Sequence, residues 1–171
     1  MDNLANYAQV LKNICENRTL GKKAVQKLMY LIERKGVDLE LGYTIHFFGP
    51  YSSKLDNILH ILQNEELIEI NTQGVTHTIS IKDVDFNMKH LSKDEKEKVA
   101  FVLDRFGNKT ALELEGITTL DFVARSLEPK GKVKVKDEEI IKEVVRIKGQ
   151  KFSDEQLQSY LKELRELSFL N

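Results

Sequence analysis

Apolar residues recur every three or four positions in two stretches near the start of the chain, which predicts two amphipathic helices. The first stretch covers residues 3–16, and the second begins after Gly21 and ends near Gly36. The second stretch also carries Tyr30 and Leu31 outside its regular apolar stripe. We therefore expect the second helix to be buried on more than one side.

The polarity pattern changes after the second helix. Residues 43–48 alternate well enough to predict a strand. The next residues, Gly49 to Ser52, predict a tight turn, because glycine accepts unusual backbone angles and proline has a fixed φ and no N–H. An apolar stripe over residues 55–62 then predicts a third helix, capped either by Ser52 or by Ser53 with Asp56 in a capping box.

Two further alternating stretches, 67–70 and 76–81, flank a loop that contains Gly74 and predict a β-hairpin. Three helices, a strand and a terminal hairpin in this order are the plan of a winged helix. We assign this winged-helix-like unit to residues 1–90.

Helical patterns fill residues 91–171. Capping boxes begin three of the predicted helices, at Ser92, Thr110 and Ser153, and a fourth helix is predicted over residues 137–148. The predicted fold class is therefore α+β and mostly helical, with a C-terminal helical layer packed on the winged-helix-like unit. Because no repeat or low-complexity linker separates the two parts, we expect one integrated body.

Composition narrows the classes of protein that the chain can represent. With 41% hydrophobic and 31% charged residues it matches globular proteins, and a net charge of −1 argues against a globally basic nucleic-acid binder. The single cysteine, Cys15, excludes an internal disulfide. The chain shows no signal peptide and no apolar run that could span a bilayer. We expect a cytoplasmic protein without a membrane partner.

Catalytic and metal-binding signatures are missing from the sequence. The four histidines and Cys15 do not follow the spacing of metal ligands. Gly21-Lys22-Lys23 lacks the remaining residues of a phosphate-binding P-loop, and no nucleophile, base and orienting group can be assembled. We expect no metal, no cofactor and no enzymatic activity. An enzyme whose site is invisible in one sequence is the third alternative considered for this chain.

A winged helix suggests DNA binding, so the distribution of basic residues matters. The third helix carries Lys54 against Asp56, Glu65 and Glu66, and the predicted wing, residues 71–78, has no lysine or arginine. Phosphate contacts normally dominate the affinity for DNA, so this face is a poor candidate for docking on a duplex. Basic residues gather elsewhere, and they define a possible nucleic-acid patch at Lys22, Lys23, Lys130, Lys132, Lys134 and Lys136.

Aromatic residues gather around the predicted strand and turn, at Tyr30, Tyr43, Phe47, Phe48 and Tyr51. They pack in the core, or some of them are exposed anchors of a protein interface, where tyrosine is enriched. The pattern alone leaves both interpretations open.

The segment that holds these aromatic residues resembles a known family. Residues 26–31, Gln-Lys-Leu-Met-Tyr-Leu, are followed by an aromatic strand, by Gly49-Pro50-Tyr51-Ser52 and by Leu55. This combination resembles the Panacea domain family, which includes SocA-like antitoxins, and most of all its uncharacterised YwgA-like members. Many Panacea antitoxins have a tryptophan in the strand before the turn, where this chain has His46-Phe47-Phe48.

The resemblance implies an antitoxin-like role without catalysis or cofactor, in which the protein binds a toxin directly or presents a bound protein to degradation machinery. The family signature would lie on Lys27, Tyr30 and Gly49 to Ser52. We therefore predict a non-enzymatic protein-binding module, and the alternative is a winged-helix DNA-binding regulator that uses the basic second helix or the lysine-rich loop. The predicted partner-binding residues are Lys27, Tyr30, Phe48, Gly49, Pro50, Tyr51 and Ser52.

Overall fold

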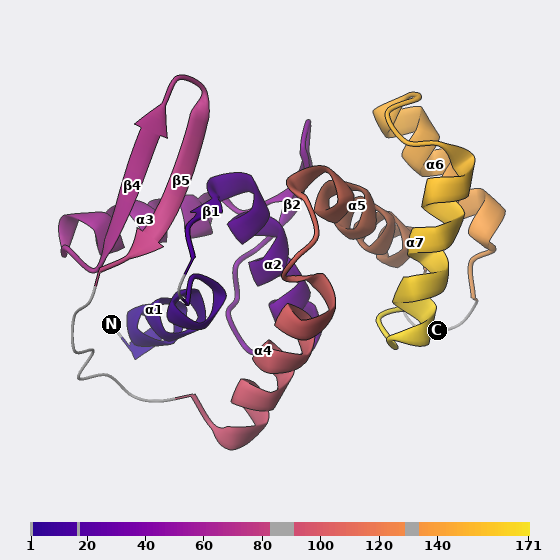
Figure 1. The fold of residues 1–171 in the computed structure, drawn as a ribbon. Coiled ribbons are helices and arrows are strands. Elements are labelled where there is room, and N and C mark those ends of the chain that lie inside the picture. The colour runs from indigo at the N-terminus through magenta and orange to yellow at the C-terminus, as the bar shows by residue number, and fades with distance from the viewer. Residues whose placement is uncertain (1, 17, 83–90, 129–133) are drawn as a thin grey trace.

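The computed structural model describes residues 2–16, 18–82, 91–128 and 134–171, and it is an α+β protein that is mostly helical, as predicted (Figure 1). None of the described helices is long and apolar enough to cross a lipid bilayer. The elements, in chain order, are α1 (Asp2–Ile14), β1 (Leu20–Gly21), α2 (Lys22–Arg34), β2 (Thr44–His46), β3 (Gly49–Tyr51), α3 (Ser53–Asn64), β4 (Ile68–Gln73), β5 (Thr76–Ile81), α4 (Lys93–Phe106), α5 (Ala111–Leu127), α6 (Asp137–Lys148) and α7 (Asp154–Glu166).

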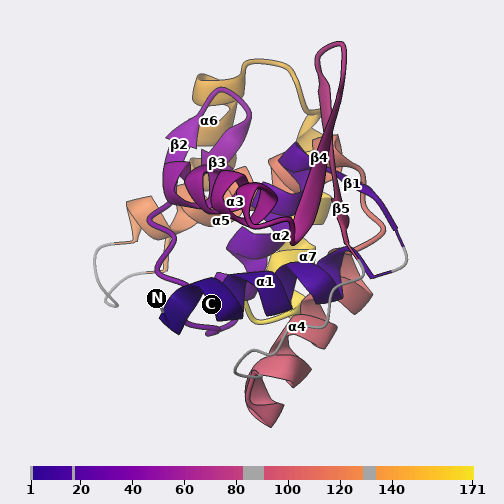
Figure 2. The same ribbon diagram turned by 90° about the vertical axis from the view of Figure 1, so that its left-hand side faces the viewer.

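The N-terminal part has the arrangement of a winged helix. It contains helices α1, α2 and α3 and a three-stranded antiparallel sheet with the strand order β1-β5-β4 (Figure 2). The sequence pattern missed β1, because a strand of two residues is too short to show alternation. Leu20 of β1 pairs with Ile79 of β5, and the Ile79 side chain is part of the hydrophobic core.

The segment between α2 and α3 differs from the prediction. Instead of one strand over residues 43–48 and a turn at Gly49 to Ser52, it forms a two-stranded hairpin of β2 and β3. Thr44 pairs with Tyr51 and His46 with Gly49, so Phe47 and Phe48 make the turn. The prediction was wrong because glycine followed by proline is typical of a turn. Both strands of a two-stranded hairpin are edge strands, and an edge strand accepts a proline although proline has no N–H.

Side-chain caps set the helix starts. Ser52 is the N-cap of α3, and its hydroxyl accepts from the Leu55 N–H at 2.9 Å. Ser53 is the first helical residue, so the alternative capping box of Ser53 with Asp56 is wrong. The capping boxes predicted at Ser92, Thr110 and Ser153 are confirmed. These caps are local, which is why the sequence identified most of them.

Helix α5 occupies the centre of the molecule, between α2 and the pair of helices α6 and α7 (Figure 1). It is buried almost continuously from Leu114 to Ala124, and it also packs against β3. Helix α2 is buried from Ala24 to Ile32, which confirms the expectation of burial on more than one side. One hydrophobic core therefore includes residues from both the winged-helix part and the C-terminal helices.

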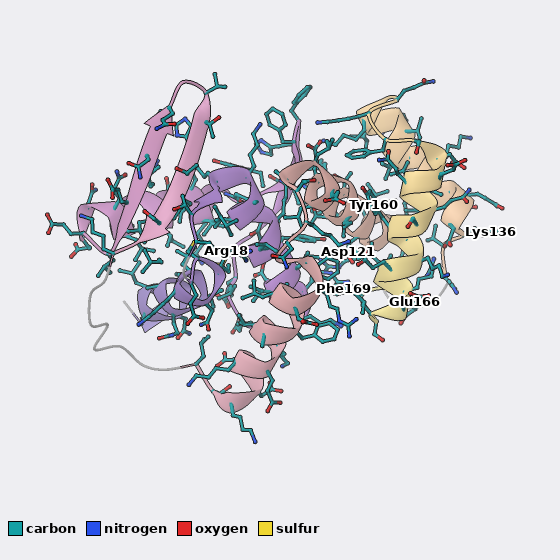
Figure 3. The ribbon with its side chains drawn as sticks, in the orientation of Figure 1. Arg18, Asp121, Lys136, Tyr160, Glu166 and Phe169 are labelled. Carbon is teal, nitrogen blue, oxygen red and sulfur yellow. The ribbon has the colours of Figure 1, made fainter. Side chains whose placement is uncertain are left out.

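A buried polar junction connects α2, α5 and the end of the chain (Figure 3). The Tyr30 hydroxyl donates to the Asp121 carboxylate at 2.6 Å, and Arg34 Nε donates to the same carboxylate at 2.7 Å. Arg34 also donates to the Phe169 carbonyl at 2.7 Å. Burial, together with the charge of Asp121, raises the pKa of Tyr30 well above its ordinary value, so the phenol stays protonated and remains a donor.

Candidate binding site at the hairpin

The base of the β2–β3 hairpin is held by two buried polar side chains of α2. Gln26 forms two hydrogen bonds with the backbone of Ser52, donating to its carbonyl at 2.9 Å and accepting from its N–H at 3.0 Å. The next residue, Lys27, donates through Nζ to the Pro50 carbonyl at 2.6 Å. The Ser52 hydroxyl donates to the Leu41 carbonyl at 2.6 Å. The two halves of the sequence motif therefore meet in space, and α2 binds the backbone that follows Gly49.

Lys27 is nearly fully buried, and this changes its acid–base chemistry. Burial is the main cause that lowers its pKa from 10.5 to about 8, and the charges of Lys148, Lys23 and Lys151 act in the same direction. Glu115 opposes this shift. The ammonium group of Lys27 is thus more easily deprotonated than that of an ordinary lysine.

The other side of the hairpin contacts the C-terminal helices. Glu115 of α5 accepts from Lys148 at 2.9 Å and from Lys151 at 2.8 Å, and Lys148 also donates to the Phe47 carbonyl. Burial by itself would raise the pKa of Glu115, but the hydrogen bonds from Lys151 and Lys148 outweigh it and lower the pKa below its ordinary value. Glu115 therefore stays ionised and fixes two lysines beside the hairpin.

Gly49 lets the hairpin approach α5 closely. Its φ is +88°, a region that favours glycine. A Cβ atom built on it would lie 2.8 Å from Thr119 Oγ1 and 3.4 Å from Glu115 Cγ. Position 49 therefore requires glycine both for its backbone angle and for lack of space.

The tip of the hairpin presents aromatic side chains to solvent. Phe47 is 81% exposed and Phe48 is 42% exposed, and their rings meet edge to face with centroids 4.9 Å apart. Lys23 Nζ lies 3.5 Å from the centre of the Phe48 ring. Turns usually carry glycine, asparagine or aspartate, so two phenylalanines at this place are unusual.

A surface pocket of about 510 Å³ lies between the start of α2, the hairpin and the tip of the β4–β5 wing. The wing contributes Val75, Thr76 and His77 to its wall. The charged and aromatic side chains that line the pocket come from α2 and the hairpin, and they are Lys22, Lys23, Lys27, Phe47, Phe48 and Tyr51.

The predicted partner-binding residues fall into two groups. Lys27, Tyr30, Gly49, Pro50 and Ser52 are buried, so they position the hairpin and offer little surface to another protein. Direct contact of these five residues with a partner stays a prediction, and their burial favours a role in holding the hairpin. Phe48 is exposed and Tyr51 is half-buried, and both line the pocket.

The described lysines of the predicted patch lie at two places in the fold. Lys22 and Lys23 lie at the start of α2, whereas Lys134 and Lys136 precede α6. Lys136 is labelled in Figure 3. Lys136 and the hairpin-bound Lys148 lie at opposite ends of α6, about 18 Å apart at 1.5 Å per helical residue. Lys130 and Lys132 lie outside the described residues.

Sequence reasoning missed Phe47 as a site residue, and it missed Glu115, Lys148 and Lys151. The two lysines look like ordinary surface residues in the sequence. Glu115 gave the one available signal, because it is a carboxylate within a helix that is otherwise buried on nearly every side. No group of three or more histidine, cysteine, aspartate or glutamate side chains within the described residues is placed to hold a metal ion.

No family model matches the chain. It is similar to the uncharacterised protein YwgA of Bacillus subtilis (strain 168), with 30% identity over 80 residues. The matched stretch is 46% of this chain and spans 43% of the length of YwgA. The similarity therefore connects part of this chain to a protein whose own function its name leaves open.

Proposed function

We propose that this protein is a non-enzymatic, cytoplasmic protein-binding module of the Panacea type, which neutralises or presents a partner protein by direct contact. The observation that carries the proposal is Phe47, an 81% exposed aromatic side chain at the tip of a firmly held hairpin. A segment whose backbone is already held in place loses less conformational entropy on binding, and aromatic anchors contribute much of the affinity in protein interfaces.

The antitoxin-like part of the proposal draws on the resemblance of residues 26–31 and 49–52 to Panacea proteins. The hydrogen bonds from Gln26 and Lys27 to the backbone of Ser52 and Pro50 support it, because they show the two motifs in direct contact at the base of the hairpin. In this proposal the motif residues hold the base of the hairpin in place, and the exposed residues of the hairpin contact the partner.

The DNA-binding alternative draws its support from the winged-helix topology and from Lys22 and Lys23. Its weakness is the outer surface of α3 and the wing. Lys22 pairs with Asp56 of α3, and residues 71–78 of the wing contain no lysine or arginine. A duplex docked on this face would meet few cations, although phosphate contacts supply most of the affinity for DNA.

The test is an affinity capture from the cytoplasmic fraction of the source cells with the tagged 171-residue chain and with its Phe47→Ala variant. A matched control is Ile61→Ala, which removes another exposed apolar side chain, from α3. Parallel lysates are treated with nuclease. We expect a discrete protein that is captured by the wild type and by Ile61→Ala, survives nuclease and is lost with Phe47→Ala.

The captured protein is then purified and its complex is reconstituted from two components. If the partner is a toxin, co-expression with the wild type restores growth and co-expression with Phe47→Ala does not. Recovery of nucleic acid with the wild type and Phe47→Ala alike would instead support the DNA-binding alternative.

A further inference from the structure

The pocket beside the hairpin concentrates positive charge. Lys22, Lys23 and Lys27 line it, and Lys148 and Lys151 reach its edge through Phe47 and Phe48. The carboxylates paired with these groups are Asp56, which binds Lys22, and Glu115, which binds Lys148 and Lys151. Five lysines against two carboxylates leave a net charge of +3 here, in a chain whose net charge is −1.

The backbone adds to this charge. Helix α2 begins at the pocket, and its N-cap Gly21 offers no side-chain acceptor to the first N–H groups. The first turn of α2 also contains no acidic residue. The positive end of the helix dipole therefore adds to the field of the lysines.

Lys27 and Lys23 contribute positive charge to the pocket in different ways. An ammonium group has three N–H donors, and the acceptor that Lys27 contacts among the described residues is the Pro50 carbonyl. Lys23 is exposed and lies over the Phe48 ring without a carboxylate partner in the described part of the chain. The exposed Lys23 ammonium group can therefore contact a carboxylate of a ligand, whereas the buried Lys27 ammonium group contributes its charge to the pocket.

Aromatic rings supply the apolar wall. Phe48 and Tyr51 line the pocket, and Phe47 extends the wall toward solvent. A matching ligand therefore needs negative charge next to an apolar side chain.

We propose that this pocket binds an acidic segment of a partner protein, in which one or two carboxylates flank an apolar side chain. The inference rests on the proposed function and names the chemistry of the partner. The apolar side chain packs against Phe47 and Phe48, and the carboxylates contact Lys23 and Lys151.

The distribution of charge favours a peptide over a nucleic-acid strand. A strand carries one negative charge per nucleotide and needs a basic track along its length. Here the pocket is not continued by a basic track along the wing or α3, because the wing tip has no lysine or arginine and α3 is followed by Glu65 and Glu66. A short acidic segment needs no such track.

The experiment is a selection of the folded 171-residue chain against a phage library of random dodecapeptides in low-salt buffer. We expect enriched peptides that combine Asp or Glu with a large apolar residue. Binding of the synthetic peptides to the wild type should weaken as salt is raised to about 300 mM, where charges are screened within several ångströms. Lys23→Gln and Lys151→Gln should each weaken binding by about three- to tenfold.

The control is Lys96→Gln, an equal change of charge at an exposed position on α4, which should leave binding unchanged. Circular dichroism of each variant separates loss of binding from loss of fold. Enrichment of neutral or basic peptides that depend on Phe47 would overturn the acidic specificity while leaving the proposed function intact. Absence of enrichment, or tighter binding of a single-stranded oligo-dT added in parallel, would overturn the inference in favour of another class of ligand.

Discussion

Lys27 carries a charge that its surroundings disfavour. Burial lowers its pKa from 10.5 to about 8, whereas unfolding returns it to solvent and to its ordinary value. Between these two values the unfolded chain binds more protons than the folded one, so the free energy of unfolding increases with pH. The folded protein therefore pays for a charged Lys27 at neutral pH and is relieved of that cost in alkaline solution.

We predict that Lys27→Met removes this pH dependence. Between pH 7 and pH 10 the free energy of unfolding of the wild type should rise by about 2 kcal/mol relative to that of the variant. Urea denaturation at both pH values measures the difference, and tyrosines that titrate at high pH contribute to both proteins alike. Lys96→Met, at an exposed position on α4, should behave as the wild type does. Equal pH dependence in wild type and Lys27→Met would contradict the lowered pKa.

The β2–β3 hairpin illustrates how an element too small to be stable alone becomes rigid. An isolated two-stranded hairpin is marginal in water. This one is fixed from α2 through the backbone of Pro50 and Ser52, and from α6 through the carbonyl of Phe47. The backbone of its aromatic tip is thereby held in place, as the proposed binding role requires.

We predict that Gly49→Ala is more destabilising than Gly74→Ala. Both glycines have positive φ, so each substitution should cost about 1–2 kcal/mol in backbone strain. Gly74 has open space around its Cα, whereas a methyl group at Gly49 would meet Thr119, which should add about 1–3 kcal/mol. Urea denaturation of the two variants gives the comparison. Equal losses of stability would show that the hairpin does not press against α5.

At the scale of the whole molecule, α5 is the element that the two halves share. It packs against α2 and β3 on one side and against α6 and α7 on the other. The buried junction of Tyr30, Arg34 and Asp121 adds polar contacts between the same halves. The winged-helix part therefore depends on residues that follow it in the chain.

We predict that residues 1–90 do not fold alone. Without α5, the buried face of α2 and the Tyr30 hydroxyl would be exposed to water, and a polypeptide of this size has little core to spare. Thermal unfolding of the fragment, followed by circular dichroism, should show no cooperative transition, whereas the full chain should unfold in a single one. A sharp transition in the isolated fragment would mean that the two parts are independent domains.

The sequence by itself determined the local elements of this protein. The helical stripes, the capping boxes at Ser92, Thr110 and Ser153, and the β4–β5 hairpin around Gly74 depend on residues close together in the chain. For the same reason the overall α+β class could be predicted. The resemblance to Panacea proteins also linked residues 26–31 with residues 49–52, but it did not show which of their atoms are in contact.

The tertiary structure decided the rest, because its causes are contacts between distant residues. The short strand β1 exists because Leu20 pairs with Ile79, and Glu115 is a buried ion because Lys148 and Lys151 return to it. Phe47 becomes an exposed tip because Gly49 pairs with His46 and Lys148 holds the turn from α6. Local polarity and spacing do not indicate these distant partners. Only the folded chain shows which motif residues hold the hairpin and which are exposed on the surface.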